Sequence, residues 1–211
     1  MNCKNKQKLS IGTQPVFLLA CHLLILATTL LLCCCNHGGD YTPKPRGYAR
    51  IDLPQRDYAP FDTAALPFAF EKSSVAMADL KKDEQRLKWI DLRYPDLGGI
   101  IFLSYIPLRK ATDLAGEVDT SYRLLSKHFD FSSGVDERAF VNPEHRVYAT
   151  TYKLQGQNVA STYQFWATDS VSHFLRGSLY IDCVPNNDSL APVLEYLQQD
   201  LDHLIETLTW K

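Results

Sequence analysis

Residues 190–208 read LAPVLEYLQQDLDHLIETL, and this stretch decides the fold. Its apolar side chains recur every three or four residues and form one stripe of a helix, with His203 and other polar residues opposite. Asp188 or Ser189 can cap the start of this helix, and Pro192 is tolerated because it lies in the first turn. A helix whose two faces differ so strongly must cover a sheet.

The residues before this helix show several strand patterns and one further helix pattern. Residues 113–129 place apolar side chains at helical spacing. Short runs rich in aromatic and β-branched residues predict strands, and residues 155–158 form a glycine-containing turn that predicts a β-hairpin. The predicted strands are residues 68–70, 87–94, 100–106, 146–154, 159–168 and 174–183.

This order of elements predicts an α+β fold. Strands that follow one another through short turns pair antiparallel, and the helices then cover the sheet. We therefore expect an antiparallel sheet flanked by helices, an αβα sandwich whose element order is similar to that of PsbP-type proteins. A fold by itself says little about activity.

The first 34 residues differ from the rest and predict a lipoprotein signal peptide. Lys4, Lys6 and Lys8 are their only charges, and residues 16–32 form an almost continuous apolar run, which is the layout of a secretory signal. The lysines stay on the cytoplasmic side of the membrane. The globular part is therefore expected outside the cytoplasm, in the cell envelope, facing the periplasm or at the outer membrane.

Three consecutive cysteines follow this apolar run. Lipoprotein signal peptidase needs a small residue before the cysteine that is lipidated and an aliphatic residue two positions further back. Cys35 fits best, with Leu32 at the aliphatic position, and Cys34 is the second choice. An uncleaved N-terminal anchor is the alternative, because residues 16–32 are at the short limit of a membrane-spanning helix.

Cleavage before Cys35 leaves an acidic chain with one unmodified cysteine. The 22 basic residues lose three lysines, which leaves 19 against 24 acidic residues and a net charge near −5. Nucleic acid is excluded as a partner, because its binding requires a basic patch. Cys183 remains without a disulfide partner, and its apolar neighbours predict a buried side chain.

Residues 35–66 predict the lipidated cysteine followed by an extended tether. Pro43, Pro45, Pro54 and Pro60 favour the polyproline II conformation, with a rise of roughly 3 Å per residue. A single globular domain is expected over residues 67–211.

Several segments resemble one known family. They are DYTPKPRGYARIDLP at residues 40–54, HFLRGSLY at residues 173–180, and LIETL at residues 204–208 with the terminal Trp210-Lys211. Together they resemble the gliding motility lipoproteins GldD of Bacteroidetes-type bacteria. The resemblance implies a lipid-anchored protein that is required for gliding and associated with type IX protein secretion. It implies other gliding and secretion envelope proteins as partners, and a non-catalytic scaffold or assembly role.

The folded part shows no spacing typical of a catalytic or metal site. Its histidines, His128, His145, His173 and His203, lack the HxH and HxxxH spacings of zinc sites. A nucleophile elbow and a phosphate-binding loop are also missing from the sequence. We expect no enzyme activity, cofactor or metal, and we expect His203 on a solvated helix surface.

Two groups of residues are candidates for docking or modification. Lys44, Arg46, Tyr48 and Arg50 lie in the proline-rich segment and are typical of a preordered docking peptide, with a solvated spacer as the alternative. Asp-Ser/Thr-apolar triplets resemble O-glycosylation acceptors of such bacteria, with ordinary turn or cap chemistry as the alternative. The acceptors would be Thr63, Ser170 and Ser189.

A ligand- or substrate-binding lipoprotein with a pocket between sheet and helix is the alternative function. An apolar cavity with a few converging polar groups would favour it. A packed core with an exposed apolar or aromatic patch would favour the scaffold.

Overall fold

The computed structural model describes five stretches of the chain, residues 14–33, 47, 50–82, 88–110 and 112–211. Residues 1–47 form one unit, in which helix α1 spans Gln14–Cys33 and contains the predicted apolar run. No helix in these stretches is long and apolar enough to span a membrane. Residues 48–211 form the second unit.

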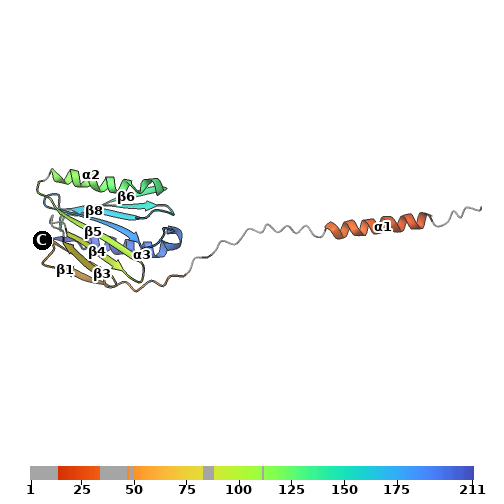
Figure 1. Cartoon of the computed structure of the whole chain (residues 1–211), viewed down its shortest axis with the longest axis horizontal. Coiled ribbons are helices and arrows are strands. Elements are labelled where there is room, and N and C mark those ends of the chain that lie inside the picture. The colour runs from red at the N-terminus through yellow and green to blue at the C-terminus, as the bar shows by residue number, and fades with distance from the viewer. Residues whose placement is uncertain (1–13, 34–46, 48–49, 83–87, 111) are drawn as a thin grey trace, which may run out of the picture. The chain divides into compact units, whose positions relative to one another are not determined.

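A seven-stranded sheet is the centre of the second unit (Figure 1). Its order is β3-β4-β5-β9-β8-β7-β6, and every neighbouring pair is antiparallel. The pairing of β5 with β9 joins two runs of strands that are consecutive in the sequence. The strands are β3 (Met77–Lys82), β4 (Lys88–Tyr94), β5 (Gly99–Pro107), β6 (Gly134–Asn142), β7 (Val147–Gln155), β8 (Tyr163–Thr168) and β9 (His173–Ile181).

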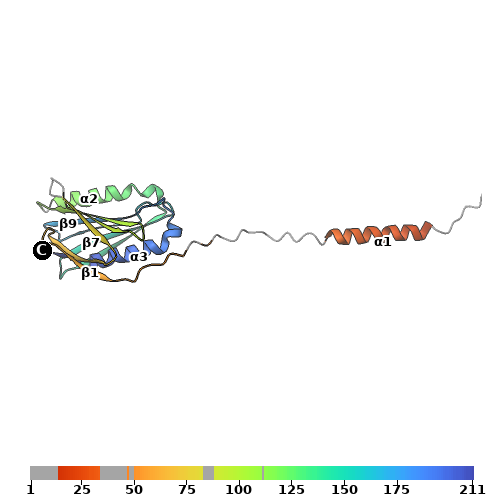
Figure 2. The same ribbon diagram turned by 60° about the horizontal axis from the view of Figure 1, so that its bottom comes forward.

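One helix lies along each face of this sheet (Figures 1 and 2). Helix α2 (Asp113–Ser126) contributes Leu125 to a small cluster with Tyr152 of β7, and a short 3-10 helix, η1 (Phe129–Phe131), follows it. Helix α3 (Asn187–Glu206) contributes its leucines to the main core. The predicted α+β class, with helices flanking an antiparallel sheet, is confirmed.

A three-stranded antiparallel sheet also packs against α3. It consists of β1 (Tyr58–Asp62), β2 (Phe68–Ser73) and β10 (Thr209–Trp210), with β2 in the middle. The buried Phe68 and Phe70 of β2 belong to the same core as the leucines of α3. Helix α3 therefore contacts two sheets and is buried on more than one side.

A buried carboxylate on α3 holds the segment that leads into β1. The side chain of Asp200 is 1% exposed, and its Oδ1 accepts hydrogen bonds from Arg56 at 2.9 Å and from the Tyr58 hydroxyl at 3.0 Å. The Arg56 guanidinium also lies 4.2 Å from the centre of the Tyr196 ring. Burial raises the pKa of Asp200, against the opposing effects of the Tyr58 hydrogen bond and the Arg56 charge.

The folded unit begins earlier than the proline pattern indicated. Strand β1 lies within residues 35–66, which were predicted as a tether, and Ile51 packs against the core. Strands β3, β6 and β10 were also not predicted. Strand β8 starts at Tyr163 rather than at residue 159, because Val159 turns into the cluster around Leu125.

Two side chains differ from their predicted environments. His203 is half-buried, because β1 and β2 cover its side of α3: its ring stacks on Tyr58 at 3.7 Å, and its Nε2 lies 2.8 Å from a carboxylate oxygen of Glu71. The predicted solvated surface is therefore wrong. Cys183 is exposed rather than buried, because β9 ends at Ile181 and the cysteine lies in the following loop.

Replacement of Arg56 by alanine is expected to destabilise the second unit by about 2–3 kcal/mol, below the range for a fully buried pair. Asp200 would keep a buried charge without its cation, and the loss should shrink as the pH falls and Asp200 gains a proton. Urea unfolding at pH 7 and pH 5 measures both effects. Arg50→Ala is the control, because the Arg50–Asp52 pair is exposed; an equal loss in both variants would contradict the role of Asp200.

Gly177→Ala is expected to destabilise the protein by about 1–3 kcal/mol through overpacking. A Cβ atom at Gly177 would collide with the Phe165 ring on the neighbouring strand β8. Gly116 of α2 is the matched control, since a Cβ there meets nothing within 4 Å and Gly116→Ala should stabilise by about 0.4–1 kcal/mol. Thermal unfolding of both variants tests this difference in sign.

Candidate functional site

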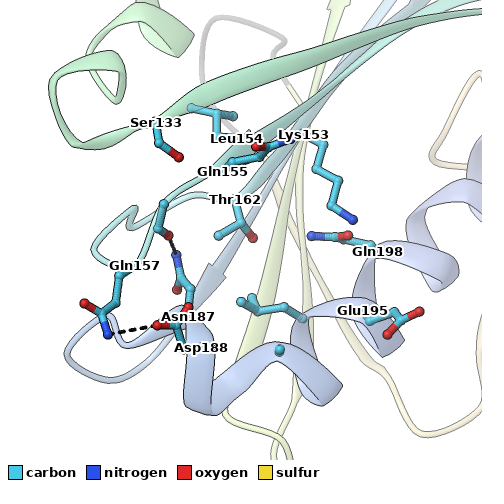
Figure 3. Close-up of a pocket in the computed structure, with 13 residues that line it drawn as sticks. Ser133, Lys153, Leu154, Gln155, Gln157, Thr162, Asn187, Asp188, Glu195 and Gln198 are labelled. Atoms are coloured by element: carbon cyan, nitrogen blue, oxygen red, sulfur yellow. Dashed lines mark hydrogen bonds between the residues drawn. The ribbon is translucent and has the colours of Figure 1, made fainter.

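A cavity of about 590 Å³ lies between the loop after β7 and the first half of α3 (Figure 3). The Asn187 amide donates hydrogen bonds to the carbonyl oxygens of Gly156 at 2.7 Å and Val159 at 3.0 Å. Gln157 donates to the Asp188 carboxylate at 3.0 Å. The loop is thus fixed against the start of the helix.

Most of the residues that line this cavity are polar. The hydroxyl oxygen of Thr162 is buried without a hydrogen-bond partner among the residues described. Lys153 of β7 extends toward Gln198 of α3 in Figure 3. Apolar side chains in the lining are few: Leu154, Ala191 and Leu194. The pocket between sheet and helix therefore exists, but it is not the mainly apolar cavity of a typical small-molecule site.

The sheet face that carries α2 is only partly covered. Helix α2 packs mainly on β8 and β9. On β4 and β5, Trp89 is 40% exposed and Phe102 is 38% exposed, and Met77 of β3 is 64% exposed. The cross-strand pairs Met77–Arg93 and Asp91–Phe102 place these side chains on the same face. This aromatic patch has the character expected of a docking surface.

A buried carboxylate that is paired with two cationic side chains lies beside the patch. Asp91 is buried, and its Oδ2 lies 2.5 Å from the Lys81 ammonium and 2.9 Å from the Arg93 guanidinium. Two cations therefore share one anion. A cavity of about 370 Å³ lies here, with Trp89 and Phe102 in its lining.

Arg176 of β9 lines this cavity and also a second one. The second cavity, of about 310 Å³, lies between the end of α2 and the sheet, and Lys127 and His128 contribute to it. Burial lowers the pKa of the half-buried Arg176 guanidinium, and Tyr180 of β9 and Glu117 of α2 act in the opposite direction. The Arg176 guanidinium has neither a hydrogen bond nor an ion pair with any residue in the described part of the chain.

Asp169 organises the turn between β8 and β9. Its Oδ1 accepts hydrogen bonds from the backbone N–H groups of residues 171–173 at 2.8 to 2.9 Å. Burial acts to raise the pKa of Asp169, but the three hydrogen bonds together bring it below its ordinary value. Ser170 adopts a φ of 69° in this turn. Asp169 therefore has a structural role at this end of the sheet.

His145 and His173 line one cavity of about 330 Å³ together with Asp169, whereas His128 lines a different cavity. His173 accepts or donates a hydrogen bond with Tyr105 at 2.9 Å and stacks on Trp210, and burial lowers its pKa. Burial and then the Lys127 charge lower the pKa of His128. Across the stretches that the structure describes, no group of three or more His, Cys, Asp or Glu residues could hold a metal ion.

The predicted anchoring and docking residues are mostly beyond what the structure describes. Arg50 is described, and it forms an exposed ion pair with Asp52 at 2.9 Å. The remaining five lie outside the described residues: Cys34, Cys35, Lys44, Arg46 and Tyr48.

The three predicted glycosylation sites differ in accessibility. The Thr63 hydroxyl oxygen is buried, and the Ser189 hydroxyl donates to the Asn186 carbonyl oxygen at 2.9 Å in the first turn of α3. Ser170 is exposed, although the neighbouring Asp169 serves the turn. Modification at these residues stays a prediction.

Sequence reasoning did not identify Trp89, Phe102 or Arg176 as candidates. The alternation within the strands was the available signal: Trp89, Asp91 and Arg93 occupy one side of β4, and buried apolar residues occupy the other. A large aromatic residue on the polar side of a strand predicts an exposed apolar position.

Comparison with known proteins gives one match. A family model described as gliding motility lipoprotein GldD matches residues 38–210. No curated protein and no solved structure matches the chain.

Asp169→Asn is expected to lower stability at neutral pH by about 1–3 kcal/mol, because the backbone donors lose a charged acceptor. The folded-state pKa of Asp169 lies below its unfolded value of 3.8, so its contribution is present above pH 3.8 and is lost as the pH falls further. Urea unfolding between pH 7 and pH 3 should show that the difference in free energy of unfolding between the wild-type protein and Asp169→Asn shrinks as the pH falls. The exposed Asp182→Asn variant is the control, and a gap that persists at low pH would refute this account.

Proposed function

The chain belongs to the gliding motility lipoprotein GldD family, and from this premise we propose that it is a lipid-anchored, non-catalytic assembly factor. It contacts other envelope proteins of the gliding machinery and of the associated type IX secretion system. The match over residues 38–210, which covers the folded unit except its last residue, carries this proposal.

Lipid attachment at Cys35 is the proposed mode of anchoring, with Cys34 as the second choice. It is supported by the family description as a lipoprotein and by the apolar helix α1, which ends at Cys33 just before these residues. The folded unit then lies outside the cytoplasm, in the periplasm or at the outer membrane.

The surface of the folded unit supports a role in assembly. The core between α3 and the two sheets is closely packed, and an aromatic patch stays exposed beside α2. A protein that holds others together needs such a surface rather than a reaction centre.

A small polar ligand is the second candidate function. The Thr162 hydroxyl favours it, because it is buried without a hydrogen-bond partner among the described residues, and such groups in native structures are usually hydrogen-bonded. Most of the residues that line the cavity carry polar groups, which could bind the polar groups of such a ligand.

A variant with Cys33, Cys34 and Cys35 all replaced by serine tests the anchor. Metabolic labelling with an alkyne fatty acid should mark the wild-type protein and leave this variant unlabelled, unprocessed in mass and unable to support gliding. The single Cys183→Ser variant is the matched control, since Cys183 is an exposed cysteine that remains in the folded unit. Membrane association at the usual mass in the triple variant would refute lipid anchoring.

A further inference from the structure

Two cavities lie on the sheet next to Arg176, whose charge forms no ion pair with the described residues. We call the two cavities that share Arg176 the Arg176 groove. One cavity lies under the end of α2, and the other lies on the open part of the sheet beside Trp89 and Phe102. Arg176 stands where the two meet.

The register of strands β4, β5, β9 and β8 determines which side chains lie next to one another along this groove. Ser104 pairs with both Trp89 and Arg176, and Arg176 pairs on its other side with Trp166. Paired residues point to the same face of a sheet and lie about 5 Å apart. Arg176 is therefore placed in a row between two tryptophans, within reach of a ligand that lies across the strands.

The charge of Arg176 is not balanced within the groove. Glu117 affects it electrostatically, but no ion pair of 4.0 Å or less joins Arg176 to a carboxylate in the described residues. A half-buried guanidinium has lost water and gains most from a carboxylate that it can bind in a bidentate manner. An external carboxylate would supply this partner.

The rest of the groove is also cationic. Lys127 lines the cavity at α2, and Lys81 lines the other; His128, whose pKa is lowered by burial and by Lys127, adds no positive charge at neutral pH. The acidic side chain in these linings, Asp91, is already bound by Lys81 and Arg93. This local excess of positive charge stands out on a mature chain whose net charge is near −5. Charge complementarity therefore favours an anionic occupant.

We propose that the Arg176 groove binds an extended acidic segment of a partner protein, with a carboxylate on Arg176 and an apolar side chain on Trp89 and Phe102. The two cavities on opposite sides of Arg176 suit a linear chain that crosses it. This inference rests on the proposed function, because it names the kind of partner that the assembly factor holds.

A membrane surface fits the groove less well than a peptide. Helix α2 forms a ridge along the same sheet face (Figures 1 and 2), and Arg176 lies half-buried beside it. A flat bilayer cannot follow the recess next to a ridge, whereas a peptide chain can. Anionic lipid remains an outcome that the experiment distinguishes.

Photocrosslinking in living cells tests the proposal on the full-length protein. A photoreactive phenylalanine analogue replaces Phe102 in one strain and the exposed Val184, in the loop before α3, in a control strain. Crosslinked peptides are mapped by mass spectrometry. At position 102 we expect a partner-protein segment that contains Asp or Glu, and at position 184 we expect no such segment.

Variants of Arg176 show whether the charge is responsible. Arg176→Gln should reduce the crosslink at position 102 at least about tenfold, and Arg176→Lys should reduce it less, because lysine keeps the charge but loses the bidentate geometry. Unchanged melting temperatures show that the variants fold. Crosslinks to lipid, to a second copy or to a segment without acidic residues, crosslinks that persist in Arg176→Gln, or no crosslink at all would each overturn the proposal.

The variant without Cys33, Cys34 and Cys35 distinguishes a failure of the groove proposal from a failure of the proposed anchored assembly role. If the strain without Cys33, Cys34 and Cys35 stops gliding while Arg176→Gln leaves the crosslink intact, the groove assignment fails and the assembly role stands. If the strain without the cysteines still glides, the anchored assembly role itself fails.

Discussion

The burial of α3 between two sheets is the constraint on which the rest of the structure depends. A helix that covers one sheet needs one apolar stripe, and the leucines of α3 provide it. The second sheet covers the polar side of the same helix. Asp200 and His203 are therefore removed from water and need partners, which Arg56, Tyr58 and Glu71 provide.

The same constraint also fixes the segment that enters β1. The Arg56–Asp200 pair and strand β1 bind the segment before residue 62 to the folded unit, and Ile51 already packs on the core. With the proposed lipid at Cys35, about 15 residues separate the anchor from Arg50. At most about 3.3–3.6 Å per residue, they reach roughly 50 Å.

The sequence predicted those elements that have a clear periodic pattern. The stripe of α3 and the apolar alternation of β5 and β7 each identify one buried face. Strand β6 was missed because it is an edge strand with mostly exposed residues. Strand β10 was missed because it is only two residues long, which is too short to show a pattern. Strand β1 contains Pro60, which an edge strand tolerates but which resembles a tether in the sequence. Arg176 could not be recognised, because its importance depends on the register of β5, β9 and β8.

Buried charges in this protein fall into two groups with different meanings. Asp200, Asp91 and Asp169 each have charged or backbone partners within the folded unit, so their burial is explained by the fold itself. Arg176 forms no ion pair with the described residues, and Tyr180 and Glu117 offset the cost of its burial only in part. The same rule that explains the first group therefore points to a partner molecule for the second.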